Sequence, residues 1–189
     1  SLRLARKAWQ LLHMDSARSI TLARDALAGA LRAGDPQGEA WARLAIGFYL
    51  LNFGTPADAA LELGAAQALC TEHDDCGGRI LAGAGLARCL YREGKYAESL
   101  ELVLPLRDEG LRVLQHEQRG VLLNTIAGSY SAQGRSEQAF AYMYQALRDS
   151  VRRFVDAEVA PHVNAWDEAG SFPRELYRKA AAVGLTGIG

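Results

Sequence analysis

The feature that most constrains this chain is an internal repeat with a period of 40 residues. Gly54, Gly94 and Gly134 stand 40 positions apart, and small residues recur seven positions before and five positions after each of them. These small residues are Gly47, Ala87 and Ala127 before the glycines, and Ala59, Ser99 and Ala139 after them. Small residues at fixed spacing let two helices approach closely, and a left-handed glycine ends a helix at little cost. The sequence therefore predicts a series of similar helical units.

The spacing of apolar residues predicts an all-α chain. Residues 60–70, 96–106 and 136–147 each place apolar side chains at positions i, i+3 and i+4, which is typical of an amphipathic helix. No stretch alternates between apolar and polar residues over the length of a strand. A fixed period in an all-helical chain indicates a repeat architecture.

The repeated positions resemble those of the tetratricopeptide repeat (TPR), a helix-turn-helix unit. The matching positions lie in residues 46–66, 86–106 and 126–146, and a weaker earlier unit lies in residues 15–31. The resemblance implies a TPR-like solenoid of helical hairpins, about three and a half repeats long, over residues 1–147. It also implies a protein-interaction, scaffold or sensory module, such as the arm of a bacterial regulator like a diguanylate cyclase.

The last part of the chain, residues 148–189, does not follow the repeat. Its patterns RRFV..EVAPH..WDE and G.FPRELYRKAA..GL.GIG resemble the N-terminal start of an acyl-CoA dehydrogenase. The resemblance implies two extra helices that are incomplete as a domain. The flavin-binding and catalytic residues of that family lie further along than residue 189, so we predict no catalytic residue, no cofactor and no enzyme activity. The alternative is a truncated or fused part of an acyl-CoA dehydrogenase system.

The two patterns meet near Leu147 without a linker rich in glycine or serine. Residues from about Ser136 to Ala160 can form one uninterrupted helix. Either two unrelated sequences are fused through a shared helix, or the tail caps the repeats. We favour a fragment or a fusion, and we expect self-association through the C-terminal helices as one consequence.

The charge balance bears on the class of partner. Lysine plus arginine number 21 and aspartate plus glutamate number 22, so no basic excess indicates nucleic acid or an anionic membrane. The longest apolar run, residues 44–51, is far shorter than the about 20 residues that span a bilayer. With only three cysteines, the expected location is the cytoplasm.

One group of residues with ligand chemistry is Cys70, His73 and Cys76, with Asp74 and Asp75 between them. Their spacing differs from that of structural zinc sites, and no further ligand pair lies elsewhere in the chain. We therefore predict no metal site, and we expect these cysteines in an exposed loop between repeats.

The stronger candidate is a binding surface. In TPR arrays, the first helix of each repeat lines a concave groove, which implies a partner-binding set of eight residues here. These are Trp41, Phe48, Asn52, Arg88, Tyr91, Arg92, Asn124 and Ser131. Aromatic rings beside arginine predict a protein or peptide partner with an acidic group and an apolar anchor. The alternative for Trp41 and its neighbour Leu44 is burial in the core. The basic clamp of chaperone-binding TPRs is not matched, because Val121 and Thr125 stand at its positions.

Overall fold

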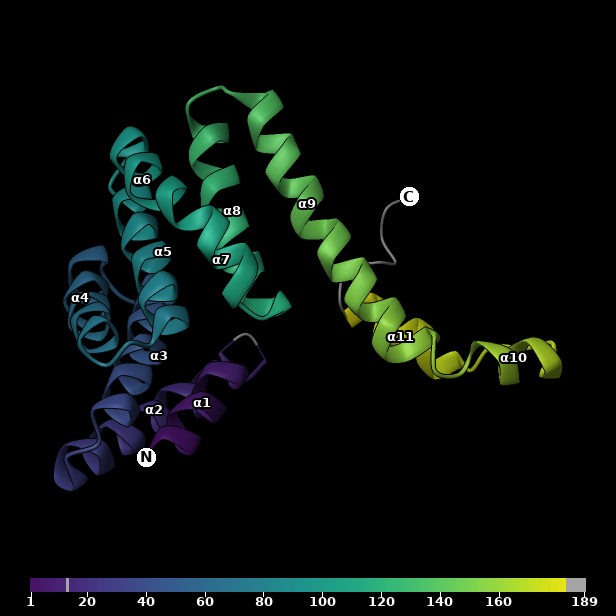
Figure 1. Cartoon of the computed structure of the whole chain (residues 1–189), viewed down its shortest axis with the longest axis horizontal. Helices are drawn as coiled ribbons and strands as arrows, with labels where there is room; N and C mark the ends of the chain where they lie inside the picture. The colour runs from purple at the N-terminus through teal and green to yellow at the C-terminus, as the bar shows by residue number, and fades with distance from the viewer. Residues whose placement is uncertain (13, 183–189) are drawn as a thin grey trace.

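The computed structural model describes residues 1–12 and 14–182, apart from the side chains of residues 116, 117 and 182. Every regular element within these residues is helical (Figure 1), so the all-α prediction is confirmed. The elements are α1 (Leu2–Leu11), α2 (Ser16–Ala33), α3 (Pro36–Phe53), α4 (Pro56–Glu72), α5 (Cys76–Arg92), α6 (Tyr96–Val103), the 3-10 turn η1 (Leu104–Leu106), α7 (Arg107–Val113), α8 (His116–Ala132), α9 (Ser136–Phe154), the π-helical turn η2 (Val155–Val159), α10 (Val163–Ala169) and α11 (Arg174–Ala182).

The 40-residue period reappears in the positions of the helices. The helices α3, α5 and α8 begin at residues 36, 76 and 116, and α4, α6 and α9 begin at residues 56, 96 and 136. Each helix of the first series packs against the next helix of the second series, and α4 also packs against α5, as α6 does against α8. The repeat in the sequence is therefore a repeat of helical pairs.

Polar side chains define where several of these helices begin. Asp35 accepts a hydrogen bond from the Gly38 amide at 2.8 Å, and Asp75 accepts one from the Gly78 amide at 2.9 Å. Thr55 caps α4 in the same way, and Pro36 and Pro56 occupy first-turn positions that need no amide proton. Such caps contribute about 1 kcal/mol each.

The glycines that mark the repeat do not all have the predicted conformation. Gly94 and Gly134 are left-handed, with φ of 80° and 73°, as predicted. Gly54 has φ −128° and ψ −158°, so the prediction is wrong there. The reason is that α3 continues to Phe53, and the Gly54 amide still donates to the Leu50 carbonyl at 2.8 Å. Only two residues then remain before Pro56, and they connect the helices in an extended form.

The small repeat residues lie where helices meet. Ala59, Ser99 and Ala139 are buried, and the Ser99 hydroxyl donates to the Ala87 carbonyl at 2.7 Å. At Gly47, an added Cβ would lie 2.6 Å from Leu63 Cγ, which is too close for any side chain. The core is therefore packed through small residues on one helix and large residues on its neighbour.

Helix α9 crosses the boundary predicted between the two parts of the chain. The prediction of one helical run from about residue 136 to residue 160 is confirmed as far as residue 159, with its last turn π-helical. Figure 1 shows α9 leading away from α1–α8, with α10 at its far end. Residues 183–189, which hold the GL.GIG part of the pattern, lie outside the described residues. Among the described residues, no helix is long and apolar enough to cross a membrane.

Candidate binding surface

Two of the predicted groove residues belong to the core instead. Trp41 is 6% exposed and Phe48 is 1% exposed, so the prediction that both line an open groove is wrong for Phe48, and Trp41 is a core residue with only an edge in the wall of a cavity beside α1. The ring of Trp9 in α1 covers them, with its centroid 4.9 Å from that of Phe48 and 6.2 Å from that of Trp41. Leu44 is also buried, so the alternative of a core position is confirmed for both Trp41 and Leu44. Burying aromatic surface stabilises the fold more than leaving it open to solvent.

Arg92 has a structural role. Its Nη1 atom donates to the Leu51 carbonyl at 2.6 Å and to the Gly54 carbonyl at 3.3 Å, so it joins α5 to the end of α3. A cation is favoured there because the last carbonyls of a helix carry partial negative charge. The expectation that both Arg88 and Arg92 are available to a partner therefore needs correction for Arg92.

Arg88 differs from its neighbour. Its side chain is half-buried, and no hydrogen bond or ion pair reaches its guanidinium from the described residues. Burial, and then the nearby charge of Arg92, lower the pKa of Arg88. A cation that is partly withdrawn from water without a counter-ion favours an anionic ligand.

The remaining predicted residues are exposed and lie on α3, α5 and α8, which pack against one another in that order. Tyr91 is 38% exposed, and its ring approaches α8 at Gly128, where an added Cβ would lie 3.6 Å from Tyr91 Cε2. Asn124 and Ser131 lie about one turn on either side of Gly128 and are exposed. Asn52 is exposed at the end of α3, beside the carbonyl that Arg92 binds. We call Asn52, Arg88, Tyr91, Asn124 and Ser131 the Arg88 surface.

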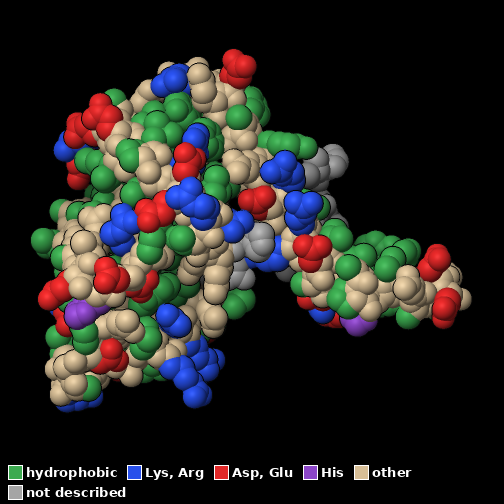
Figure 2. All heavy atoms as spheres, viewed as in Figure 1, with side chains coloured by type: hydrophobic (Ala, Val, Ile, Leu, Met, Phe, Trp, Pro, Cys, Tyr) green, Lys and Arg blue, Asp and Glu red, His purple; other side chains and the backbone are tan. Residues whose placement is uncertain are grey.

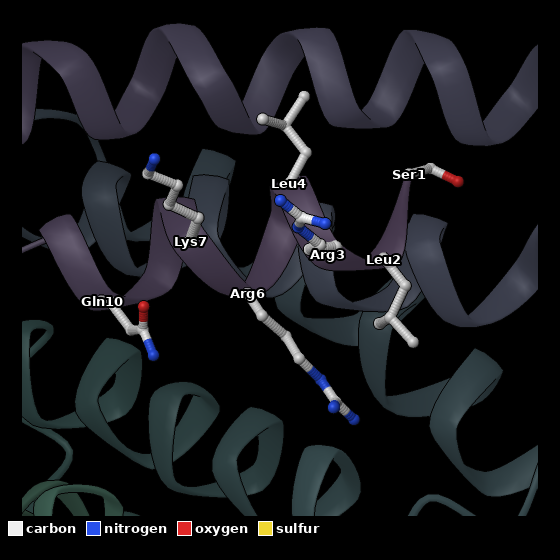
Figure 3. A pocket seen from close by; sticks show the side chains of 7 residues that line it. All are labelled: Ser1, Leu2, Arg3, Leu4, Arg6, Lys7 and Gln10. Atoms are coloured by element: carbon white, nitrogen blue, oxygen red, sulfur yellow. The ribbon is translucent and has the colours of Figure 1, made fainter.

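Two hollows elsewhere in the structure are weaker candidates for a binding site. A cavity of about 420 Å³ lies between α1 and the starts of α5 and α8, with Trp41 and Asp75 in its wall. The Asp75 carboxylate already accepts hydrogen bonds from the Trp41 indole and the Gly78 amide. A second hollow lies along α1, where Figure 3 shows the Arg6 and Lys7 side chains pointing to opposite sides. These side chains do not converge on a ligand.

The cysteine cluster serves packing. Cys70 is 2% exposed, so the expectation of an exposed loop is wrong for this residue, which belongs to the last turn of α4. Burial raises the pKa of the Cys70 thiol to about 12. The Cys76 thiol donates to Glu109 Oε1 at 2.8 Å, and that bond raises its pKa. Within the described residues, no group of three or more histidine, cysteine or acidic side chains could hold a metal ion.

The tail presents apolar side chains to solvent. Val163, Phe172 and Tyr177 are 42%, 55% and 61% exposed, and Figure 2 shows hydrophobic side chains gathered along the arm that contains α10. Local contacts hold the tail together: Lys179 Nζ lies 2.5 Å from Glu158 Oε2, and the rings of Trp166 and Phe172 meet edge to face. These helices therefore leave apolar surface open to solvent.

Residues 143–189 match the family described as "Acyl-CoA dehydrogenase, N-terminal domain". Over 49 residues the chain is 45% identical to the mitochondrial long-chain specific acyl-CoA dehydrogenase of Sus scrofa, and 43% identical to that of Mus musculus. Over 44 residues it is 43% identical to the benzylmalonyl-CoA dehydrogenase of Aromatoleum aromaticum. No solved structure matches the chain.

These similarities cover a limited part of each protein. They span 26% of this chain and 11% of the Sus scrofa and Mus musculus enzymes, and 23% of this chain and 12% of the Aromatoleum aromaticum enzyme. The resemblance predicted for the tail is therefore confirmed, and it begins within α9, a few residues before the predicted boundary. The C-terminal quarter of this chain is similar to the start of acyl-CoA dehydrogenases.

Proposed function

We propose that this chain is a helical binding module of an acyl-CoA dehydrogenase system, and that its tail docks on a flavoprotein subunit. The match of residues 143–189 to the dehydrogenase N-terminal domain carries the proposal. The exposed side chains of Val163, Phe172 and Tyr177 support it, since these helices leave apolar surface for the remainder of such a domain to cover. We assign no oxidation chemistry to residues 1–189, whose similarity reaches only 11% of the Sus scrofa enzyme.

A direct test is a calorimetric titration of this chain into the purified Sus scrofa long-chain enzyme, in parallel with flavin absorbance and acyl-CoA oxidation by the chain alone. The chain alone should be colourless and inactive, and the titration should show saturable binding. The double variant Phe172→Ser/Tyr177→Ser should weaken binding by about tenfold, since exposed apolar anchors carry much of a binding energy. Leu61→Ser is the matched control, because Leu61 is 75% exposed on α4 and lies outside both the tail and the Arg88 surface.

Two results would contradict this proposal. Absence of binding, both to the intact enzyme and to an enzyme that lacks its own matching segment, would exclude docking. A stoichiometric flavin spectrum of the isolated chain would replace the binding role with a catalytic one.

A second candidate function belongs to the repeat part. We infer that residues 1–147 form a TPR-like solenoid whose Arg88 surface binds a protein segment with a carboxylate and an apolar anchor. The half-buried Arg88 guanidinium, which has no counter-ion among the described residues, favours this function. Tyr91 beside it offers a ring for the apolar part of the segment. A desolvated, charge-assisted hydrogen bond of this kind is worth about 1.5–3 kcal/mol.

A further inference from the structure

One side of α9 carries an exposed apolar strip within the repeat part of the chain. Phe140, Met143, Tyr144 and Leu147 are 68%, 51%, 68% and 41% exposed. Their spacing of three, four and seven residues places them on one face of the helix. We call these four residues the α9 strip.

Two of the strip positions, those of Phe140 and Met143, are buried in the unit before. Met143 corresponds to Val103 and Leu63, which are both 0% exposed, and Phe140 corresponds to Leu100, which is 5% exposed. Leu63 is covered because the next first-series helix packs on it: an added Cβ at Gly85 of α5 would lie 2.8 Å from Leu63 Cδ1. Within the described residues, α9 packs against α8 but has no such helix on its other side. The α9 strip therefore has the form of a helix-packing surface without its partner.

The charged side chains beside the strip indicate what kind of partner would fit it. Glu137, Arg148 and Arg152 are exposed and have no hydrogen bond or ion pair within the described part of the chain. Glu137 and Arg148 are 11 residues apart, which is about three helical turns, so they lie along the same edge of the strip. This edge of α9 thus carries a negative charge on the N-terminal side of the strip and positive charges on its C-terminal side.

We propose that the α9 strip binds the α9 strip of a second copy of this chain, with the two helices antiparallel and a twofold axis between Met143 and Tyr144. In that arrangement position 137 of each copy faces position 150 of the other, because the two positions are equally far from the axis. Glu137 of each copy therefore lies between Arg148 and Arg152 of the other. Parallel pairing would instead place like charges opposite each other. This dimer goes beyond the proposed docking on a dehydrogenase and does not depend on it.

The experiment is sedimentation velocity of the full chain over a range of concentrations. The wild type should form dimers, and Glu137→Arg should weaken dimerisation by about tenfold or more, since it opposes cations of the partner at both ends of the interface. The triple variant Glu137→Arg/Arg148→Glu/Arg152→Glu should restore dimerisation by exchanging every sign. Glu101→Arg, an exposed position on α6 outside the strip, is the matched control and should dimerise as the wild type does.

Circular dichroism should show the same helicity for all four proteins, so a loss of dimer is not a loss of fold. Wild-type chains that stay monomeric, or a triple variant that fails to recover, would overturn the proposal. A monomeric wild type whose binding to the Sus scrofa dehydrogenase is weakened by Tyr144→Glu would also overturn it, and would assign the strip to that enzyme.

Discussion

The indole nitrogen of Trp41 donates a hydrogen bond to Asp75 Oδ2 at 2.7 Å and so joins two helices of successive repeats. The other oxygen of the same carboxylate accepts the amide of Gly78 at 2.9 Å and caps α5. One side chain therefore both starts a helix and holds it against α3. Because Asp75 accepts the indole N–H, Trp41 can be buried in the core with its polar group satisfied.

Replacing Asp75 should destabilise the repeat strongly. Asp75→Ala removes the cap of α5 and leaves the buried Trp41 indole without an acceptor, so we expect a loss of about 2–3 kcal/mol in the free energy of unfolding. Asp75→Asn keeps an acceptor oxygen and should cost less. Urea denaturation followed by circular dichroism measures both. As a control, Asp15→Ala removes an exposed cap of α2 alone, and an equal loss from Asp15→Ala and Asp75→Ala would show that the Trp41 bond is unimportant.

Two glycines should respond in opposite directions to alanine. Gly94 has φ 80° with open space around it, so Gly94→Ala is penalised by the left-handed backbone alone, by about 1–2 kcal/mol. Gly64 lies within α4, also in open space but with an ordinary helical backbone, so Gly64→Ala should stabilise by about 0.5–1 kcal/mol. Thermal melts of the two variants provide the comparison. Melting points that shift in the same direction would contradict the placement of Gly94 in a turn and of Gly64 within a helix.

The sequence was sufficient for the helices and the period because both depend on local chemistry. Caps such as Asp35 and Thr55, and small residues such as Ser99, mark each unit within a few residues of where they act. The continuity of α9 could be predicted for the same reason, since nothing in residues 136–159 interrupts a helix.

The surface was predicted less well because it depends on packing between distant segments. Trp9 lies 39 positions before Phe48 and covers it, yet the weak repeat pattern around α1 does not reveal that contact. Arg92 binds carbonyls at the end of α3, 38 and 41 positions earlier in the chain, which lack an acceptor role within that helix. The α9 strip could have been found by comparing Phe140 and Met143 with their buried equivalents 40 residues earlier.

The three cysteines should differ in reactivity. Burial raises the pKa of Cys70 to about 12 and that of Cys89 to about 11, so both thiols stay protonated near neutral pH and should not react with a thiol-specific reagent in the folded protein. Cys76 is half-buried, and its bond to Glu109 raises its pKa, so it should react slowly.

Glu109→Gln provides the check on Cys76. Removing the carboxylate charge takes away the main cause of the raised pKa, so the rate of Cys76 labelling should rise at a lower pH than in the wild type. Labelling with Ellman's reagent, with urea-unfolded protein as the reference for all three thiols, measures this. Rapid labelling of Cys70 in the folded protein would contradict its place in the core.

The two neighbouring arginines should separate folding from binding. Arg92→Ala removes the hydrogen bonds to Leu51 and Gly54 and should cost about 1 kcal/mol of stability. Arg88→Ala removes a half-buried cation that no described residue neutralises, so stability should change by less than about 0.5 kcal/mol or increase.

The affinity for a partner should depend on Arg88 rather than on Arg92. Against a panel of peptides that pair one aromatic residue with glutamates, Arg88→Ala should weaken affinity by about tenfold, whereas Arg88→Lys should restore part of it and Arg92→Ala should leave it nearly unchanged. Fluorescence anisotropy and urea melts on the same proteins measure both quantities. Unfolding of Arg88→Ala would show that Arg88 is structural, and peptide binding that is insensitive to Arg88 would exclude the Arg88 surface as the binding site.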